Sequence, residues 1–185
     1  MLDATGESGS TVYADEGTAA HALLEKCLRQ DLEPWRFKGG VIKAADEGVS
    51  FHNHNAELGN RCFKIDDDMI DAVAEGYEYT KQRLRDLSGA DLHVEQYSRM
   101  FDHRHDVGGT ADIVIDQMYG MLEVADYKHG RGILVDAEDN SQLLMYLYGI
   151  AQASDFMHEE YRYTIIQPRH PRYSGPIWTL SLIHI

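Results

Sequence analysis

Two aspartates and a lysine lie in neighbouring segments that are rich in β-branched residues. These residues are Asp112, Asp126 and Lys128, and a short break with a glycine at 116–120 separates the two segments. This arrangement is typical of an antiparallel hairpin. If the turn centres on Tyr119, Asp112 lies directly opposite Asp126. Residues two apart on a strand share a face, so Lys128 then lies beside Asp126.

The three side chains have the chemistry of a divalent-metal site. Two facing carboxylates repel each other unless a cation lies between them, and hard divalent cations prefer carboxylate oxygens. A neighbouring ammonium can orient or deprotonate a water molecule. The alternative interpretation is a solvated sheet face with a cross-strand salt bridge. Asp126 continues the apolar stripe of Leu122 and Val124, and a desolvated carboxylate needs a partner or a metal, so both interpretations stay open for the hairpin alone.

The hairpin belongs to a series of five short motifs. In chain order they are Gly17-Thr-Ala-Ala-His21, Glu95, Gly109-Thr-Ala-Asp112, Asp126-Tyr-Lys128 and Gln142-Leu-Leu-Met-Tyr146. This order resembles the pattern of the PD-(D/E)XK nuclease superfamily in its RecB-like branch. The phrase at 13–21 also resembles the opening of a phage-encoded, exonuclease-like group within that superfamily. The likeness spans about residues 14–167, and the stretch 31–65 matches nothing in the pattern.

The resemblance implies an enzyme that uses Mg²⁺ or Mn²⁺ and acts on DNA. The residues that it assigns to the metal are His21, Asp112, Asp126 and the main-chain carbonyl of Tyr127. It makes Glu95 a third acidic group at the metal and gives Lys128 the task of positioning the attacking water. It also implies that Gln142 and Tyr146, which share one helix face at a spacing of four, help to place the DNA.

Each assigned residue also has a purely structural interpretation. His21 borders the apolar stripe of an amphipathic helix, and a histidine in that position is more often a hydrogen-bonded packing residue than a ligand. The ordered motifs favour the ligand. Glu95 could be an exposed charge on an edge strand. Gln142 and Tyr146 could equally be packing and capping residues.

Length and composition are compatible with a single nuclease-like domain over residues 1–185. The chain has 185 residues, of which 43% are hydrophobic, enough to bury one core. With only Cys27 and Cys62, it carries no four-cysteine iron–sulfur cluster of its own, unlike some RecB-like relatives. No apolar run approaches membrane-spanning length and the N-terminus lacks an export signal, which predicts a cytoplasmic protein in a bacterial or phage-infected cell.

The charge balance argues against easy binding of DNA. The chain has 31 acidic and 17 basic residues, for a formal net charge of -14, whereas most nucleic-acid binders have basic surfaces. The alternative interpretation is an acidic protein with no nucleic-acid partner. Divalent cations, local basic groups and a partner protein of phage recombination or replication could supply the missing positive charge.

The apolar patterns predict an α/β fold with the restriction-endonuclease-like order α-β-β-β-α-β, in which a central mixed sheet is flanked by helices. The predicted helices cover about 13–30, a segment that starts near 66–68, and 138–154. The first three strands cover about 91–101, 108–116 and 120–128, and two more follow near 161–167 and 177–182. The segment 31–65 is expected to be an irregular insertion, and Asp136 and Asp139 are capping candidates for the third helix.

We therefore expect a Mg²⁺- or Mn²⁺-dependent deoxyribonuclease, an exonuclease of phage or bacterial recombination or repair. One alternative is a catalytically silent relative that binds DNA or a replication partner. Another is a small-molecule oxygenase with iron bound by the cluster from His103 to Asp106. The apolar run at the end predicts a fragment of a longer protein in which Ser181 to Ile185 are not native.

Overall fold

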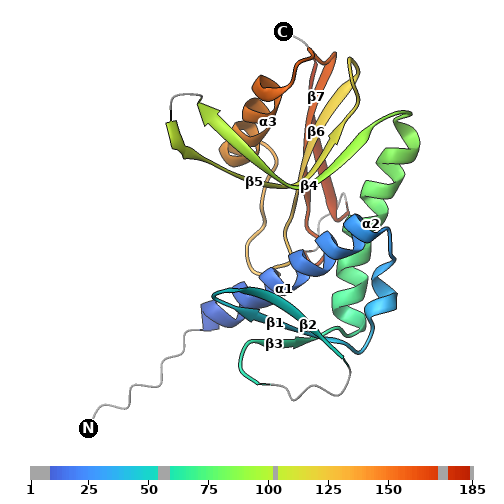
Figure 1. Cartoon of the computed structure of the whole chain (residues 1–185), viewed down its shortest axis with the longest axis vertical. Helices are drawn as coiled ribbons and strands as arrows, with labels where there is room; N and C mark the ends of the chain where they lie inside the picture. Colours follow the sequence, from blue (N-terminus) through green and yellow to red (C-terminus); the bar gives the residue numbers. More distant parts are fainter. Residues whose placement is uncertain (1–8, 54–58, 102–103, 171–174, 184–185) are drawn as a thin grey trace.

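A five-stranded mixed sheet forms the centre of the molecule (Figure 1). The computed structural model describes residues 9–53, 59–101, 104–170 and 175–183. The strands, in spatial order, are β4 (Asp91–Phe101), β5 (Arg104–Asp116), β6 (Met121–Tyr127), β7 (Glu160–Ile166) and β8 (Ile177–Ile183). Only the β6–β7 pair is parallel, and the other pairs in this sheet are antiparallel.

Helices cover both faces of this sheet and create two cores. On one face lie α1 (Gly9–Gln30) and α2 (Asp67–Asp86), and on the other lies α3 (Ser141–Ala153). Ile113 and Ile115 of β5 pack toward α1 and α2, whereas Val114 packs toward α3, as expected for alternating side chains. The expected α/β class with a helix-flanked mixed sheet is confirmed. Within the described ranges, no helix is long and apolar enough to cross a membrane.

The helix starts follow capping chemistry. The side chain of Asp66 accepts a hydrogen bond from the Met69 amide at 3.0 Å, so α2 begins where its acidic residues predicted. The cap of α3 is Asn140, not Asp136 or Asp139. An N-cap residue has an extended backbone, but Asp139 has a φ of 57° and therefore lies in the left-handed region.

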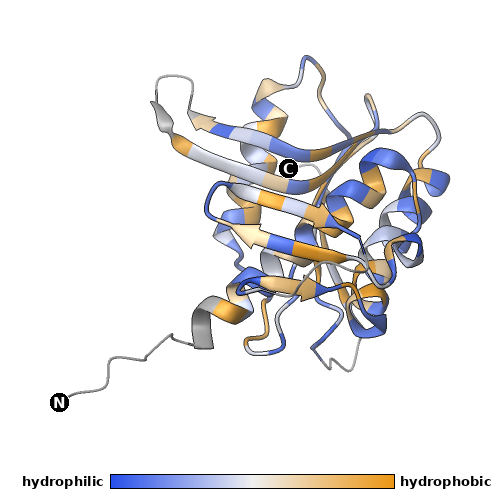
Figure 2. Ribbon diagram, turned by 60° about the horizontal axis from the view of Figure 1, so that its bottom comes forward, coloured by the Kyte–Doolittle hydropathy of each residue, from blue (hydrophilic) through white to orange (hydrophobic). Residues whose placement is uncertain are grey.

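The segment 31–65 is not irregular, which corrects the expectation from the sequence. It contains a short 3-10 helix, η1 (Pro34–Phe37), and the strands β1 (Val41–Ala45), β2 (Gly48–His52) and β3 (Cys62–Lys64). These strands form a separate antiparallel sheet in the order β2-β1-β3, which mixes apolar and polar residues along its strands (Figure 2). Ile42 and Ala44 are buried and Lys43 between them is exposed, so this sheet uses one face to cover α1.

The β5–β6 hairpin has the predicted turn. Gly120 donates its amide hydrogen to the Gln117 carbonyl at 2.8 Å, and Tyr119 has a left-handed backbone with a φ of 63°. The β5–β6 ladder ends with the pair Ile113 and Ala125, one residue before Asp112 and Asp126. The β4–β5 pair continues beyond this point, so β5 is longer than the sequence predicted.

Candidate metal centre

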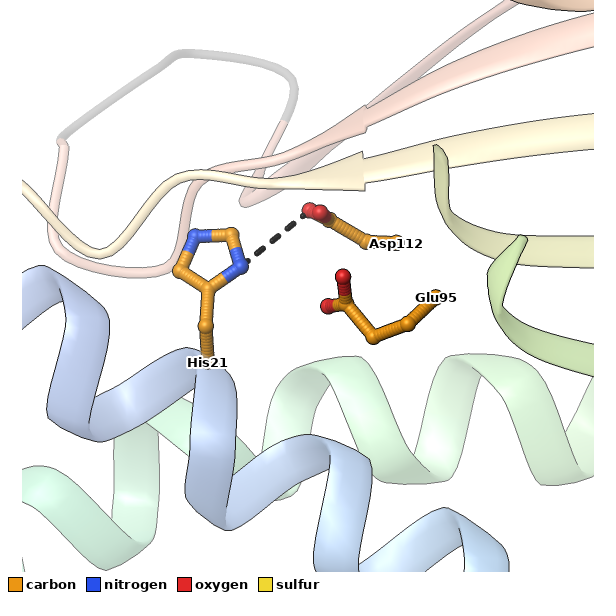
Figure 3. A group of neighbouring side chains, drawn as sticks. All are labelled: His21, Glu95 and Asp112. Atoms are coloured by element: carbon orange, nitrogen blue, oxygen red, sulfur yellow. Dashed lines mark ion pairs between the residues drawn. The ribbon is translucent and has the colours of Figure 1, made fainter. Parts of the chain in front are cut away.

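Three side chains from three separate elements converge beside the central sheet (Figure 3). His21 comes from α1, Glu95 from β4 and Asp112 from β5, and one potential ligand atom from each lies within 4.8 Å of the others. The His21 Nδ1 atom is 3.4 Å from Asp112 Oδ2. They open on a cleft of about 670 Å³ that is also lined by Glu25 and Lys128. The structure therefore brings together residues from three of the five motifs.

The packing of α1 orients His21. The stripe predicted from the sequence is buried, with Ala20, Leu23 and Cys27 fully covered. His21 lies at the border of this stripe, and its ring meets the buried Tyr127 ring edge-on with 5.3 Å between centroids. The ring is thus held by an aromatic contact on one side and faces Asp112 on the other.

Asp112 lies at a fork, where β6 separates from β5. Beyond the last ladder pair, the Tyr127 amide has no carbonyl partner on β5, and it donates instead to Asp112 Oδ2 at 2.7 Å. The carboxylate thereby replaces a ladder hydrogen bond and keeps the two strands together at the site. This contact would be needed for a purely structural role too. Asp112 therefore stabilises the fold whether or not it also binds a metal.

The backbone of Glu95 brings its carboxylate to the α1 side. Consecutive strand residues normally face opposite sides of a sheet, yet both Val94 and Glu95 lie toward α1. Glu95 has a φ of 54°, in the left-handed region, and the unchanged register around it places it opposite Asp112. Such a backbone costs about 1–2 kcal/mol for a residue other than glycine. Strain of this kind gathers at functional sites.

Comparing two variants of Glu95 tests this strain. Glu95→Gly and Glu95→Ala both remove the carboxylate, and only the glycine removes the left-handed penalty. We expect Glu95→Gly to be more stable than Glu95→Ala by about 1 kcal/mol, measured by urea unfolding. An ordinary strand position gives the opposite order by about 0.5–1 kcal/mol. An alanine variant as stable as the glycine variant would show that Glu95 is unstrained.

Asp126 and Lys128 form a pair beside the three-residue cluster. Lys128 Nζ donates to Asp126 Oδ1 at 3.0 Å and lies 2.8 Å from Oδ2. Asp126 is 5% exposed, whereas the lysine side chain reaches the cleft. Asp126 is not a member of the close cluster of His21, Glu95 and Asp112. The predicted pairing of Asp126 with Lys128 on one strand edge is present.

The electrostatics of the site favour added positive charge. Burial raises the pKa of Glu95 and of Asp126, and the charge of Asp112 raises both further. Burial lowers the pKa of His21, but its hydrogen bond to Asp112 and the charges of Asp112 and Asp126 outweigh this, so its pKa is raised overall. Three carboxylates therefore share one ammonium and one imidazole, and a bound cation would relieve their repulsion.

The donor set fits a divalent cation. Ligand atoms on opposite sides of Mg²⁺ or Ca²⁺ are separated by about 4–5 Å, which matches the 4.8 Å limit of the cluster. The buried Oδ2 of Asp126 lies 2.8 Å from the Lys128 ammonium but accepts no hydrogen bond from any described group. One imidazole among carboxylates suits Mn²⁺ as well as Mg²⁺. His21, Glu95 and Asp112 could hold the ion, with the buried Asp126 beside them.

A buried chain of contacts behind the cleft was missed in the sequence. The Tyr127 hydroxyl lies 2.8 Å from His129 Nδ1, and His129 Nε2 lies 3.5 Å from Glu16 Oε1. Arg169 Nη1 donates to the same oxygen of Glu16 at 2.7 Å. Burial and the charge of Arg169 lower the pKa of His129 to about 4, so its ring is neutral near pH 7. In the sequence, Glu16 and His129 are marked only by lying next to motif residues. Glu16 precedes Gly17, and His129 follows Lys128.

Gln142 and Tyr146 lie on α3, on the other side of the sheet from His21. Gln142 Nε2 donates to the Tyr146 hydroxyl at 2.9 Å. A Cβ atom on Gly109 would lie 2.5 Å from that hydroxyl, so the glycine makes room for the tyrosine. Neither α3 residue is among the described residues that line the cleft. The iron alternative falls on 103–106, where the structure does not describe the side chains.

Comparison with known proteins assigns the chain to a family. A family model described as "Protein of unknown function (DUF2800)" matches residues 1–182. The chain belongs to the DUF2800 family. No solved structure matches it. For this DUF2800 chain, the likeness to PD-(D/E)XK nucleases therefore rests on its motifs and on the arrangement of the residues within them.

Proposed function

We propose that this DUF2800 chain is a Mg²⁺- or Mn²⁺-dependent deoxyribonuclease with a PD-(D/E)XK-like core of the RecB-like branch. One observation carries the proposal. His21, Glu95 and Asp112 lie far apart in the sequence, yet their ligand atoms are within 4.8 Å of one another. Beside them lies the buried Asp126, paired with a lysine that reaches the same cleft. This combination of ligands and ammonium suits phosphodiester hydrolysis.

The order of the elements supports the same core. Along the chain, α1 is followed by the three antiparallel strands β4, β5 and β6, then by α3 and by β7, which is parallel to β6. If the small sheet and α2 are treated as an insertion after α1, this succession supports the α-β-β-β-α-β order. His21 on α1, Glu95 on β4 and Asp112 on β5 support the proposal, because these elements correspond to the first helix and the first two strands of that order.

In the proposed reaction, the residues have separate tasks. His21, Glu95 and Asp112 would hold the metal, and Asp126 and the Tyr127 carbonyl would be its further ligands. A bound divalent cation would lower the pKa of a water molecule and neutralise charge on the phosphate. Lys128 donates a hydrogen bond from its ammonium to the attacking water, and Asp126 orients that ammonium through the contacts of 2.8 and 3.0 Å.

The proposed setting is DNA end processing in phage or bacterial recombination or repair. This part of the proposal rests on the likeness of the segment 13–21 to phage-encoded exonuclease-like proteins. With a net charge of -14, the chain gains little from general attraction to phosphates. We therefore infer that the metal and a partner protein contribute to holding DNA.

A catalytically silent DNA- or partner-binding protein is the second candidate. The observation that favours it is that the acidic groups already have structural contacts. Asp112 accepts from the Tyr127 amide, and Asp126 is paired with Lys128. A relative without activity would keep these contacts for the fold alone.

A cleavage assay separates the two candidates. End-labelled linear duplex and single-stranded DNA are incubated with the chain in Mg²⁺, in Mn²⁺ and in EDTA. The nuclease proposal predicts cleavage with either metal and none in EDTA. Binding of DNA without cleavage in any metal, with enzyme in excess, would favour the silent protein.

A substitution of His21 tests the metal shell. A nitrogen ligand among oxygens favours Mn²⁺ over Mg²⁺, so His21→Ala should weaken Mn²⁺ binding by at least about tenfold and narrow the difference between the two metals. Isothermal titration calorimetry measures both affinities. His93→Ala, which changes an exposed histidine on β4, is the matched control. Equal Mn²⁺ affinity before and after His21→Ala would return His21 to a packing role.

A further inference from the structure

The β4–β5 pair carries an exposed aromatic residue and an exposed cation beyond the metal centre. Tyr97 lies two residues after Glu95 on β4 and is 51% exposed. Arg99 follows at the same spacing, is also exposed, and has no ion-pair partner among the described residues. Thr110, the exposed partner of Tyr97 on β5, lies beside it. The group Tyr97, Arg99 and Thr110 is called the hairpin platform below.

The glycines of β5 show which way the hairpin platform faces. Gly109 faces α3, because its added Cβ would meet the Tyr146 hydroxyl at 2.5 Å. Gly108 therefore faces the other side, and its added Cβ would meet the Tyr97 hydroxyl at 2.6 Å. Asp112 has the same parity on β5 as Gly108 and reaches His21. Tyr97 thus lies on the face of the sheet that also carries the metal centre.

The bare backbone of Gly108 also fixes the tyrosine ring. The Tyr97 Cζ atom would lie 2.9 Å from a Cβ on Gly108, so the end of the ring rests where another residue would have a side chain. A ring held in this way loses little conformational freedom when it binds a flat partner. The ring lies close to Glu95, on the face that carries the metal centre. It is therefore placed to contact another part of the same substrate.

We propose that the hairpin platform stacks an unpaired nucleotide of the DNA on Tyr97 and contacts a phosphate through Arg99. The identity of the ligand rests on the proposed nuclease function. Bases stack on aromatic side chains without regard to sequence, and a nearby arginine tracks the backbone. In a duplex both faces of an internal base are already covered by its neighbours. The platform therefore selects single-stranded DNA or a frayed end.

The charge of the chain supports this choice. Proteins that bind duplex DNA without sequence preference gain affinity by neutralising many phosphates. A chain with a net charge of -14 does this poorly. Stacking on a ring does not depend on net charge, so it provides affinity that the surface lacks. Each phosphate contact releases about 0.7 counterions from a single strand and about 0.9 from duplex DNA, so charge contributes less to the binding of a single strand.

Fluorescence anisotropy with labelled oligo(dT), in Ca²⁺ instead of Mg²⁺, tests the platform. Tyr97→Ala should weaken binding by about 5- to 150-fold, since a stacked base contributes about 1–3 kcal/mol. Tyr97→Phe, which keeps the ring, should bind as the wild type does. Tyr119→Ala is the matched control, because Tyr119 is 58% exposed in the turn at the other end of β6. Thermal unfolding checks that each variant folds.

The salt dependence distinguishes stacking from charge. Arg99→Ala should reduce the slope of log affinity against log salt by about 0.7, the value for one phosphate of a single strand. Tyr97→Ala should leave this slope unchanged. Unaltered oligo(dT) binding by Tyr97→Ala, or an equal loss on a blunt duplex, would overturn the platform. If the wild type binds oligo(dT) through Tyr97 but cleaves no DNA, the nuclease proposal fails and the platform stands.

Discussion

Asp126→Asn should abolish Mg²⁺-dependent cleavage of linear DNA while leaving the fold intact. The substitution keeps the shape of a buried side chain but removes the charge that orients Lys128 and that would attract the proposed metal. Because a bound metal lowers the reaction barrier by several kcal/mol, we expect the cleavage rate to fall by about a thousandfold or more. Initial rates at saturating metal measure it, with Asp91→Asn at an exposed position of β4 as the control. Undiminished cleavage by pure Asp126→Asn would remove Asp126 from the site.

The same variant should be more stable than the wild type without metal, by an amount that depends on pH. Burial and the Asp112 charge raise the pKa of Asp126 in the folded protein. Above the ordinary carboxyl pKa of about 4, the folded state therefore binds more protons than the unfolded state, and stability falls as the pH rises through the raised value. Asp126→Asn escapes this loss, so its advantage should be smallest below about pH 4 and largest near neutral pH. An advantage that shrinks as the pH rises would contradict the raised pKa.

Lys128→Met should lower turnover by about a hundredfold to ten-thousandfold, the range for a group that acts on a proton in the transition state. Methionine retains part of the apolar stem and deletes the ammonium that contacts Asp126. We expect the loss in the single-turnover rate at saturating Mn²⁺, with Mn²⁺ affinity largely retained.

The structural interpretation of Lys128 predicts a different result. If the lysine is only a salt-bridge partner, the variant should keep its rate and lose little stability, about 0–1 kcal/mol for a partly exposed pair. Lys43→Met, at an exposed position of the small sheet, controls for the loss of a lysine elsewhere. An unchanged rate for Lys128→Met would reject its catalytic role.

The elements that carry regular periodicity could be predicted from the sequence. The stripe of Leu23 and Cys27 predicted α1, and the acids before Met69 predicted the start of α2. The β5–β6 turn around Tyr119 followed from two β-branched segments with a short break. These features depend on local pattern, which one sequence shows directly.

Other features depend on contacts between distant residues. The small sheet escaped prediction because β1 is short and its partner β3 lies across the segment 53–61. The left-handed backbone of Glu95 could not be predicted from the sequence, because glutamate rarely adopts this conformation. The contact of His129 with Glu16 on α1 also depends on residues far apart in the sequence. These features orient the side chains of the candidate metal ligands.

The proposed function requires that the cluster on α1, β4 and β5 binds a divalent cation. A crystal structure of the chain soaked in Mn²⁺, with anomalous scattering recorded near the manganese edge, tests it most directly. We expect an anomalous peak at about 2.0–2.3 Å from His21 Nδ1 and from an oxygen of Asp112, on the side that faces Glu95 and Asp126. A fully soaked crystal with no peak between these side chains, or with manganese bound elsewhere, would contradict it.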